Sequence, residues 1–428
     1  MNDNNFISGT FSRLFRLGET AGRFGYAILK NFGAYNNIDI EQIIKVVDNL
    51  SRLKGAPMKV GQMLSLHEDL LPPEIIEIFR VLQKDSNPMP FSMVQEVLKR
   101  ELKEKLQDFS FIEEKPFASA SIGQIHRAVL KNNDKVVLKI QYPGIRKSIH
   151  TDLATIKIIL SPLFNALDIP FDHAWEEVRE RLLEEVDYIH ELNNLKLFHQ
   201  RVHIDGLVFP KYYEEYTTQE VLTLSYEESL TLQEAIKDQK YIQNHEQWLT
   251  TLLKLIVYSL YGYGILHVDP NAANFGFRNN EVVLYDFGCI KKIPENISRS
   301  YKEVAYATMY HDWDRAVRAL YDAGFKTKDN QPYPISFIKP HLEILEEIFP
   351  DRETYFGEDS KLYQRLMEIA RDSWKDVKNF NFPKDIIFIH RNLIGQFGNL
   401  RKFRVKKNWK KVFLELLNQT DEIKKQFY

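Results

Sequence analysis

The chain is nearly without cysteine and nearly without net charge. Its one cysteine among 428 residues, Cys289, excludes an intramolecular disulfide framework and fits a reducing compartment. A formal net charge of −2 argues against a protein that coats nucleic acid. We therefore expect no nucleic-acid partner and a cytoplasmic protein, peripheral to a membrane at most.

Long apolar segments are also lacking. The longest apolar run, Leu252–Leu266, is interrupted by Lys254 and is shorter than the ~20 residues that a membrane-spanning helix needs. The N-terminal stretch MNDNNFISGTFSRLF has no cationic segment followed by an apolar core, so it does not predict a secretory signal. The sequence contains no internal repeat. Its length suits a two-lobed globular unit with an extension.

The strongest chemical signal lies in Ile265–Ile290. Asp269 is followed five residues later by Asn274, and a short apolar strand expected at Val282–Tyr285 leads directly into Asp286. The order H-x-D-x-x-x-x-N and then D-F-G is the sequence form of a kinase catalytic centre. Each fragment alone is a run of common residues. Together, in this order and with a strand between them, they indicate a site for phosphoryl transfer.

The chemistry explains these residue types. Asp269 is expected to reach the hydroxyl that attacks the γ-phosphate of ATP, while Asn274 and Asp286 supply oxygen ligands for Mg²⁺ or Mn²⁺. Magnesium prefers hard oxygen ligands and keeps several waters, so one amide and one carboxylate suffice beside the nucleotide phosphates. His267 in this pattern more often supports the loop backbone than transfers protons.

A nucleotide-binding region is expected in the preceding part of the chain. Strands are predicted at Ile125–Leu130 and Val136–Gln141, and Lys139 on the second matches the lysine that contacts the α- and β-phosphates of ATP. The loop before them is rich in alanine and serine where a kinase has glycines, and small residues still let the backbone approach phosphates. Its candidate nucleotide-binding residues are Ala118, Ser119, Ala120, Ser121 and Gly123.

Lys139 needs a partner, because an unpaired charge in an apolar strand is costly. The helix expected between Trp175 and Leu197 offers three candidate carboxylates, which are Glu185, Asp187 and Glu191. Further on, a strand is expected to end in a hinge at Leu224–Glu227. The backbone of Leu224 and Tyr226 would bind adenine there.

These residues carry a family resemblance. The chain resembles the UbiB/ADCK family of atypical kinases from about Ser51 to Lys292, and more weakly through FIHRNLIGQFGNLRKF near the C-terminus. The most specific element is K-x-G-Q, here Lys59-Val60-Gly61-Gln62; on composition alone this stretch is equally typical of a solvated helix face. The alanine-rich loop Ala118–Gln124 and the E-x-D element, Glu185-Val186-Asp187, also match.

The resemblance implies roles for these residues. Glu191 becomes the glutamate expected to pair with Lys139. Lys59 and Gln62 are implied to lie on a helical segment over the active site, with Glu185 and Asp187 close to it. One departure is visible, because the family's H-x-D-P-H-P-G-N reads HVDPNAAN here. Asp269, Pro270 and Asn274 are kept, and Asn271-Ala272-Ala273 stand where the family has His-Pro-Gly.

The expected fold is α+β, a two-lobed protein-kinase-like fold with a helical N-terminal extension. We place the extension at residues 1–107, a β-rich N-lobe at 108–227 and a helical C-lobe at 228–428. Helices are predicted near 40–53 and 246–261 and, in the C-lobe, near 298–323, 335–348, 361–374 and 384–398. The basic stretch Arg401–Leu417 is predicted to be an amphipathic helix, which either contacts anionic lipid or packs on its own domain.

The expected function is that of an atypical kinase-like protein with ATPase activity or phosphotransferase activity towards a small molecule or lipid. The resemblance links it to ubiquinone or other isoprenoid-lipid metabolism, with quinone precursors or lipids as partners. Two alternatives use the same nucleotide site and stay open. One is a protein serine/threonine kinase, and the other is a nucleotide-gated module that binds a lipid or quinone with little turnover.

Overall fold

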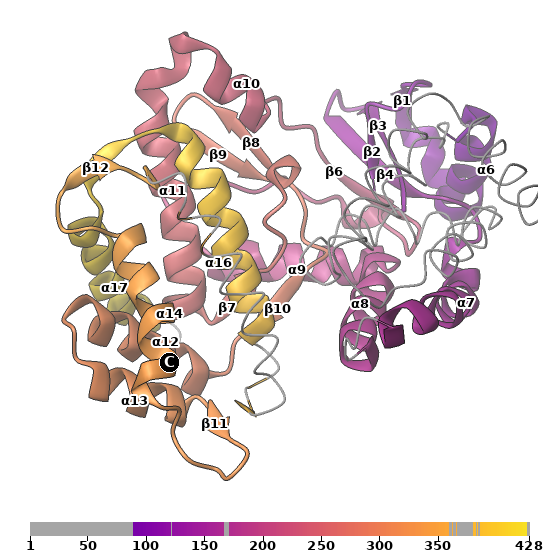
Figure 1. The fold of residues 1–428 in the computed structure, drawn as a ribbon. Coiled ribbons are helices and arrows are strands. Elements are labelled where there is room, and N and C mark those ends of the chain that lie inside the picture. Colours follow the sequence, from indigo (N-terminus) through magenta and orange to yellow (C-terminus); the bar gives the residue numbers. More distant parts are fainter. Residues whose placement is uncertain are drawn as a thin grey trace, which may run out of the picture. The chain divides into compact units, whose positions relative to one another are not determined.

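The computed structural model describes residues 89–120, 122–166, 171–358, 362, 365, 380–381, 383 and 386–425 (Figure 1). The K-x-G-Q segment with Lys59 and Gln62, the helix predicted at 40–53, Ser121 and most of the helix predicted at 361–374 lie outside these residues. Within the described residues the chain forms two compact units. The first runs to His190 and includes Tyr212–Tyr226, and the second comprises Glu191–Lys211 and the chain from Glu227 onward.

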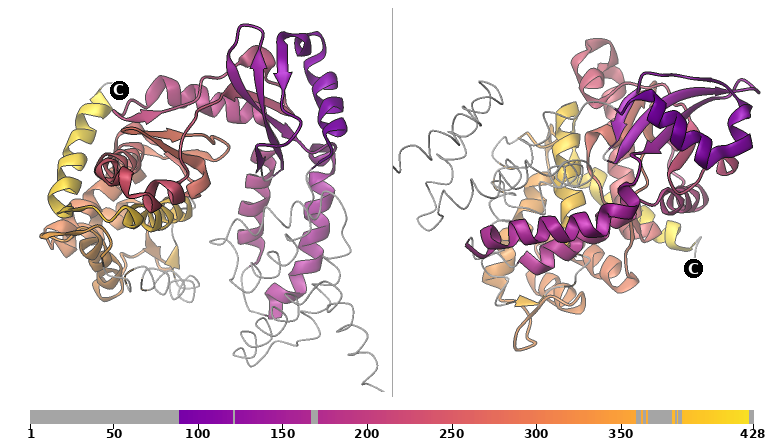
Figure 2. Two further views of the ribbon diagram at one scale, coloured as in Figure 1. Left: turned by 90° about the horizontal axis from the view of Figure 1, so that it is seen from above. Right: turned by 90° about the vertical axis from the view of Figure 1, so that its right-hand side faces the viewer.

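The first unit contains an antiparallel sheet in the order β1-β3-β4-β6, with β2 paired to β3 (Figure 1). Helices α7 and α8 lie side by side (Figure 2). Its strands and helices are α6 (Phe91–Leu102), β1 (Phe109–Ile112), β2 (Ala118–Ala120), β3 (Gly123–Leu130), β4 (Lys135–Gln141), α7 (Ile145–Ala166), α8 (Phe171–Glu185) and β6 (Val221–Ser225). The strands predicted at 125–130 and 136–141 are confirmed, and α7 was not predicted.

Side-chain alternation along β4 decides which face of this sheet becomes core. Val136, Leu138 and Ile140 are all fully buried, and they pack in one cluster with the apolar face of α6. Burial of such side chains contributes about 1.5–3 kcal/mol each. Because successive side chains of a strand point to opposite faces, Lys139 projects from the other face. The half-buried lysine is thereby kept out of the core.

The single helix predicted between Trp175 and Leu197 is interrupted. Helix α8 ends at Glu185, and a new helix, α9 (Tyr188–Arg201), begins after Asp187. The carboxylate of Asp187 accepts hydrogen bonds from the backbone N–H groups of Ile189 (3.0 Å) and His190 (3.4 Å). A short acidic side chain before a helix satisfies otherwise unpaired N–H donors in this way. Apolar periodicity continues across the break, which is why the sequence predicted one helix.

The second unit is mostly helical, with small sheets of two or three strands in its described part (Figure 1). Strand β9 pairs with both β5 and β8, and β7 pairs with β10. Its helices are the remainder of α9, α10 (Leu232–Lys237), α11 (His245–Tyr258), α12 (Glu295–Met309), α13 (Trp313–Asp322), α14 (Ile335–Ile348), α16 (Ile386–Leu400) and α17 (Trp409–Lys425). Its strands are β5 (Leu207–Val208), β7 (Ile265–His267), β8 (Phe275–Arg278), β9 (Glu281–Leu284), β10 (Ile290–Lys292), β11 (Lys326–Thr327), β12 (Glu353–Tyr355), β13 (Phe380–Asn381) and β14 (Lys406–Asn408).

Of the helix predictions for this unit that fall on described residues, two are confirmed and two need correction. Helix α14 has the predicted bounds, and α16 overlaps the prediction at 384–398. The predicted helix near 298–323 is instead α12 and α13, because Asp312 caps a new helix by accepting a hydrogen bond from the N–H of Arg315 (3.1 Å). The helix predicted at 246–261 ends its regular part at Tyr258 and continues as one π-helical turn, Ser259–Tyr263.

The basic stretch Arg401–Leu417 is not one amphipathic helix. It contains a 3₁₀ turn at Arg401–Phe403 and strand β14 before α17 begins. Its largest apolar side chains are buried, with exposed fractions between 0% and 4% for Phe403, Trp409, Phe413 and Leu416. Of the two alternatives, the structure shows the stretch packed on its own unit. These apolar groups are therefore not presented to a lipid surface.

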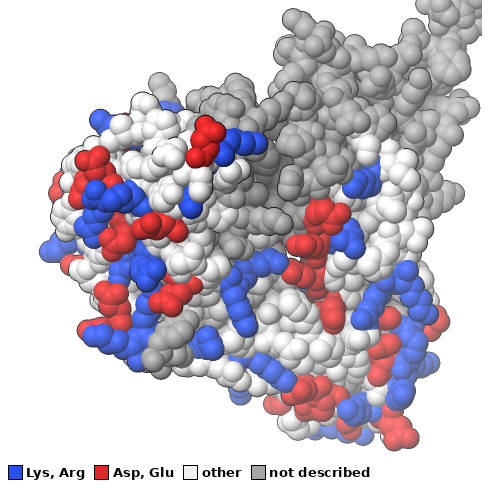
Figure 3. All heavy atoms as spheres, turned by 90° about the horizontal axis from the view of Figure 1, so that it is seen from below, with Lys and Arg blue, Asp and Glu red and all other residues white. Residues whose placement is uncertain are grey.

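Charged side chains of both signs are interspersed on the face shown in Figure 3. This agrees with the net charge of −2. Within the part of the chain that the structure describes, no helix has the length and apolar character needed to cross a membrane.

Candidate functional site

The predicted catalytic loop leaves strand β7 and returns into strand β8. Asp269 accepts a hydrogen bond from the N–H of Asn271 (3.0 Å), and the side chain of Asn271 accepts one from the N–H of Ala273 (3.0 Å). These bonds close a short 3₁₀ turn at Ala272–Asn274. Side-chain capping of this kind stabilises tight turns. The residues that depart from the family pattern thus form an ordered loop.

Asp269 and Asn274 are brought into direct contact. The Nδ2 group of Asn274 donates a hydrogen bond to Oδ2 of Asp269 at 2.9 Å. Because the amide nitrogen of Asn274 faces the carboxylate of Asp269, the amide oxygen points away from that carboxylate. An amide oxygen is a suitable ligand for a metal ion. Both side chains are half-buried.

The peptide backbone around Asp286 is held by three side chains of the second unit. The Nε2–H of His267 donates to the carbonyl of Asp286 (2.9 Å), and Asn194 donates to the carbonyl of Phe287 (2.8 Å). A carboxylate oxygen of Glu191 accepts from the N–H of Phe287 at 3.4 Å. His267 therefore acts on the loop backbone, as the sequence pattern suggested. The backbone around the candidate metal ligand is fixed before any ligand arrives.

Phe287 anchors the same segment in the core. It is fully buried, and its ring meets the rings of Phe198 and Phe209 edge-on at centroid distances of 5.4 and 5.7 Å. The adjacent Asp286 is half-buried, and its Oδ1 accepts the N–H of Gly288 at 2.9 Å. An aromatic anchor beside a more accessible carboxylate places the carboxylate without burying its charge.

Helix α16 holds the backbone of the predicted catalytic loop through two hydrogen bonds. The sequence analysis did not predict these contacts. Asn392 donates to the carbonyl of His267 at 2.6 Å, and Asn399 donates to the carbonyl of Pro270 at 2.7 Å. Gly395 lies so close to Pro270 that an added Cβ would come within 2.3 Å of its ring. The weak C-terminal resemblance, FIHRNLIGQFGNLRKF, covers these residues and was the available signal.

A small cavity of about 10 Å³ lies between α11, β7 and α16. Three buried polar atoms around it have no protein partner among the described residues, namely Oγ of Ser259, Nδ1 of His267 and Oδ1 of Asn392. This volume matches the lower limit for one water molecule. A water there can accept from Ser259 and donate to His267 and Asn392. That arrangement favours the tautomer in which Nε2–H of His267 faces the carbonyl of Asp286.

In the first unit, Lys139 lies on β4 opposite Ile125 and Leu222 of the neighbouring strands. Its Nζ is 5.2 Å from the ring centre of Tyr188, at the first residue of α9. A cation at this distance over an aromatic face is stabilised electrostatically. Glu191 follows three residues later on α9 and is 3% exposed. Residues three apart on a helix share a face.

The alanine-rich segment forms a hairpin in place of a long loop. Ala118, Ser119 and Ala120 of β2 pair with Ile125, Gln124 and Gly123 of β3. A Cβ at Gly123 would lie 2.1 Å from the carbonyl oxygen of Ile140. Glycine is therefore required at this position by the close approach of two strands, independently of any phosphate.

The predicted hinge lies where the chain passes from the first unit to the second, after Tyr226. Leu224 pairs with Val137 within the sheet, and the N–H of Tyr226 donates to the carbonyl of Lys135 (2.9 Å). These backbone groups are thus used by the sheet. The N–H of Tyr226 is not available to an adenine base in this arrangement.

A guanidinium group that sequence reasoning missed lies beside this segment. The Arg127 Cζ atom is 3.9 Å from the ring centre of Phe117 and 4.9 Å from that of Tyr226, and its Nη2 donates to the Tyr226 hydroxyl (3.2 Å). Arg127 and Lys139 lie on the same face of the sheet, because both alternate with buried neighbours. No sequence pattern predicts the contact between Arg127 and Tyr226, because the two residues lie far apart in the chain.

The described residues contain no group of three or more histidine, cysteine, aspartate or glutamate side chains placed to hold a metal ion. A metal at this site would be held by Asp286 and the amide oxygen of Asn274, with nucleotide oxygens completing its shell. This donor set suits Mg²⁺, which retains waters and binds substrate phosphates. The residues present therefore fit the expected ion.

Comparisons with known proteins show a matching family and similar relatives. Residues 81–320 match the ABC1 atypical kinase-like domain. The chain is 29% identical over 387 residues to the mitochondrial atypical kinase COQ8B of Danio rerio, covering 87% of this chain and 60% of that protein. It is 30% identical over 370 residues to the mitochondrial atypical kinase COQ8B of Rattus norvegicus, covering 82% of this chain and 67% of that protein.

A solved structure has a similar fold. The Rv3197 protein of Mycobacterium tuberculosis, determined as a complex with erythromycin, superposes with a TM-score of 0.63 at 24% sequence identity. The likeness covers 91% of this chain and 97% of that one. At this identity it bears on the fold alone. Together with the match to the ABC1 atypical kinase-like domain, the mixed α+β architecture is that of a kinase-like fold.

Proposed function

Because the chain belongs to the ABC1 atypical kinase-like family, we propose that it binds ATP with Mg²⁺ and transfers the γ-phosphoryl group to water or to a small lipid-related acceptor. We further propose that it supports ubiquinone or other isoprenoid-lipid metabolism. A kinase-like family implies nucleotide binding. The acceptor and the pathway are part of the proposal.

The observation that carries the proposal is the bond between Asn274 Nδ2 and Asp269 Oδ2. It places a carboxylate that can accept a proton next to an amide oxygen that can bind a metal. Asp286, half-buried on a fixed backbone, supplies the anionic ligand. Mg²⁺ would neutralise phosphate charge, and the residues would contribute positioning, which accounts for most of the catalysis of phosphoryl transfer.

In the proposal Lys139 holds the α- and β-phosphates, and the K-x-G-Q segment with Lys59 and Gln62 restricts the acceptor. In this proposal the segment would leave room at the catalytic loop for water or a slender amphipathic molecule and would exclude a protein serine. We propose the residue divisions 1–107, 108–227 and 228–428 for the extension and the two lobes. Contact with anionic lipid remains a proposal for surfaces other than the buried apolar groups of Arg401–Leu417.

The purified protein is expected to release phosphate from ATP in the presence of Mg²⁺ and to phosphorylate general protein substrates poorly. Phosphate release is measured with and without a phenolic quinone analogue and with and without liposomes, next to radiolabel transfer to myelin basic protein. Stimulation by either additive supports a small lipid-related acceptor. Robust labelling of myelin basic protein would make the protein-kinase alternative the correct one. Tight nucleotide binding with no turnover under any condition would favour the nucleotide-gated binding module.

Lys139 and Glu191 are expected to act through one contact in nucleotide binding. Lys139→Ala and Glu191→Ala should each weaken Mg-ATP binding, and the double variant should cost much less than the sum of the two. Such non-additivity is the signature of groups that interact directly. The measurement is a double-mutant cycle on the dissociation constant, determined by calorimetry.

Glu191→Gln is the matched control for this cycle. An amide at position 191 keeps an oxygen for the N–H of Phe287 but removes the charge, so it separates support of the Phe287 backbone from pairing with lysine. If Glu191→Gln binds Mg-ATP as well as the parent chain, charge pairing is unimportant. Strict additivity of the two alanine variants would exclude Glu191 as the partner and direct attention to Glu185.

A further inference from the structure

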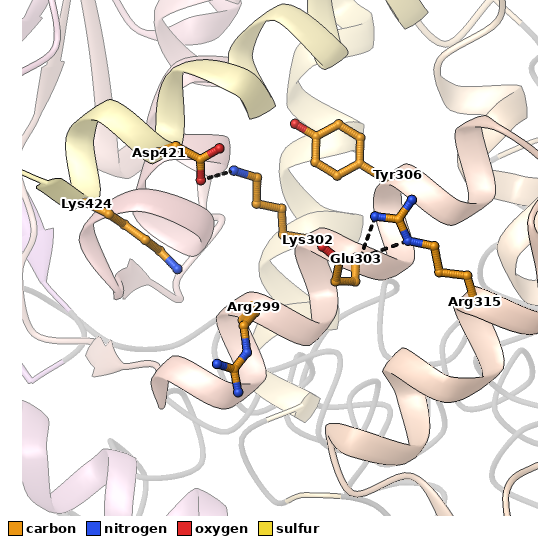
Figure 4. A pocket seen from close by; sticks show the side chains of 7 residues that line it. All are labelled: Arg299, Lys302, Glu303, Tyr306, Arg315, Asp421 and Lys424. Atoms are coloured by element: carbon orange, nitrogen blue, oxygen red, sulfur yellow. Dashed lines mark hydrogen bonds and ion pairs between the residues drawn. The ribbon is translucent and has the colours of Figure 1, made fainter.

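A second polar cavity lies in the second unit, away in sequence from the kinase-like motifs. Its volume is about 360 Å³, and it is formed by α12, α13 and α17 (Figure 4). None of its lining side chains belongs to the candidate nucleotide site. The lining residues are Arg299, Lys302, Glu303, Tyr306, Arg315, Asp421 and Lys424.

Both carboxylates of this cavity are already engaged. The guanidinium group of Arg315 donates two hydrogen bonds to Glu303, at 2.8 and 2.6 Å. The ammonium group of Lys302 donates to Asp421 at 2.6 Å. Figure 4 shows each cation directed at its own carboxylate. The charges cancel within each ion pair, so the two carboxylates have no second hydrogen-bonded cation in the lining.

The remaining cations are Arg299 and Lys424. Among the described residues, neither makes a hydrogen bond or a contact ion pair, although Lys424 feels the charges of Glu295 and Asp421. Figure 4 shows both beside the same cavity. Burial lowers the pKa of Lys424, and the positive charges of Lys302 and Arg299 lower it further, although Glu295 and Asp421 act in the opposite direction. The lining therefore carries four cationic and two carboxylate side chains, and Asp421 and the neighbouring Glu295 offset its excess positive charge only in part.

The buried ammonium group of Lys302 adds to the positive potential of the cavity. Its side chain is 9% exposed, whereas the side chain of its partner Asp421 is 66% exposed. A buried charge interacts more strongly with its neighbours than a solvated one, because water screens it less. An anion entering between α12 and α17 would meet a buried cation and two unpaired ones.

We propose that this cavity binds a phosphomonoester dianion, carried either by a small soluble metabolite or by a lipid headgroup. Such a group carries about −1.5 to −2 charges at neutral pH, which matches the two uncompensated cations. Arginine offers a planar fork to two phosphate oxygens, and lysine adds a point charge. The volume lies at the lower end of the range for small-ligand sites, which fits a compact phosphorylated molecule.

The test compares two variants of equal charge change. Arg299→Gln combined with Lys424→Gln removes both unpaired cations of the cavity. Arg318→Gln combined with Lys425→Gln removes one exposed arginine of α13 and one exposed lysine of α17, both outside the cavity lining. Binding of glycerol 3-phosphate and of inorganic phosphate is measured by calorimetry on the full chain. Flotation with phosphatidylcholine vesicles, with and without phosphatidic acid, measures binding to a headgroup.

The cavity variant is expected to bind the phosphomonoester about tenfold more weakly or worse, because charge-assisted hydrogen bonds are lost. The control variant should bind like the parent chain. Retention by phosphatidic acid vesicles alone would identify a headgroup, and binding of glycerol 3-phosphate would identify a soluble ligand. Equal affinity in the parent and the cavity variant, or no binding of any probe by the parent, would overturn the proposal.

The same set of proteins separates this site from the nucleotide site. Stabilisation by Mg-ATP should be unchanged in the cavity variant, since its two residues lie outside the kinase-like motifs. Asp286→Asn should keep phosphomonoester binding while losing Mg-ATP binding. If Asp286→Asn abolishes both, the phosphomonoester is binding at the nucleotide site and the cavity is not its receptor.

Discussion

Replacing Asp286 with asparagine is expected to abolish stabilisation by Mg-ATP. Asp286 is the anionic member of the proposed metal-binding pair, and an amide in its place removes the charge that attracts the ion. At a nucleotide concentration about 100 times the dissociation constant, a bound ligand adds about 2.7 kcal/mol to the free energy of unfolding. The variant should lose this increment. Thermal unfolding with and without Mg-ATP measures it.

The structure predicts that Asp286→Asn folds normally. An amide oxygen at position 286 can still accept the N–H of Gly288, and the carbonyl at this position is still held by His267. Without nucleotide, the variant should unfold within about 1 kcal/mol of the parent chain, which is the net value of one hydrogen bond. If Mg-ATP stabilises the variant as strongly as the parent, Asp286 is not the metal ligand.

Replacing Asp269 with asparagine is expected to reduce turnover by about 10²–10⁴-fold, the usual contribution of a general base. Nucleotide binding should change little, because Asp269 is assigned to the nucleophile. Single-turnover phosphate release and calorimetric binding of Mg-ATP measure the two effects separately. A parallel loss of both would mean that the loop had collapsed.

The loop geometry calls for a second variant. Both oxygens of Asp269 accept hydrogen bonds, one from the N–H of Asn271 and one from Nδ2 of Asn274. An amide at position 269 must turn its NH₂ group towards one of these donors and forfeit about 0.5–1.5 kcal/mol. In the exchange variant Asp269→Asn with Asn274→Asp, the amide at 269 can donate to the carboxylate at 274. The exchange should restore loop stability and leave turnover low. Recovery of turnover would show that Asp269 serves the loop and not the chemistry.

Local chemistry made the catalytic segment predictable. The strand expected at 282–285 was found at Glu281–Leu284, and the pattern assigned Asp269 and Asn274 to one site, where they are hydrogen-bonded. The sequence likewise predicted the strand that carries Lys139 and the strand before it. These features depend on neighbours within a few residues, so the order of residue types suffices to fix them.

Breaks between helices were harder to predict. Asp187 and Asp312 each interrupt a predicted helix by capping a new one, and in each case the apolar pattern continues beyond the break. Stretch Arg401–Leu417 combines a turn, a strand and a helix, although its composition is that of a basic amphipathic helix. Strand β14 forms only because β12, about fifty residues earlier in the chain, pairs with it.

The sequence by itself therefore determined the family, the kinase-like motifs and the residue types that a metal and a phosphate require. The tertiary structure decided which side chains hold the catalytic loop in place. Asn392 and Asn399 reach the carbonyls of His267 and Pro270 across more than a hundred residues, and Gly395 is needed because Pro270 packs against it. Buried polar groups find their partners only once helices pack, and sequence spacing carries no record of such distant pairs.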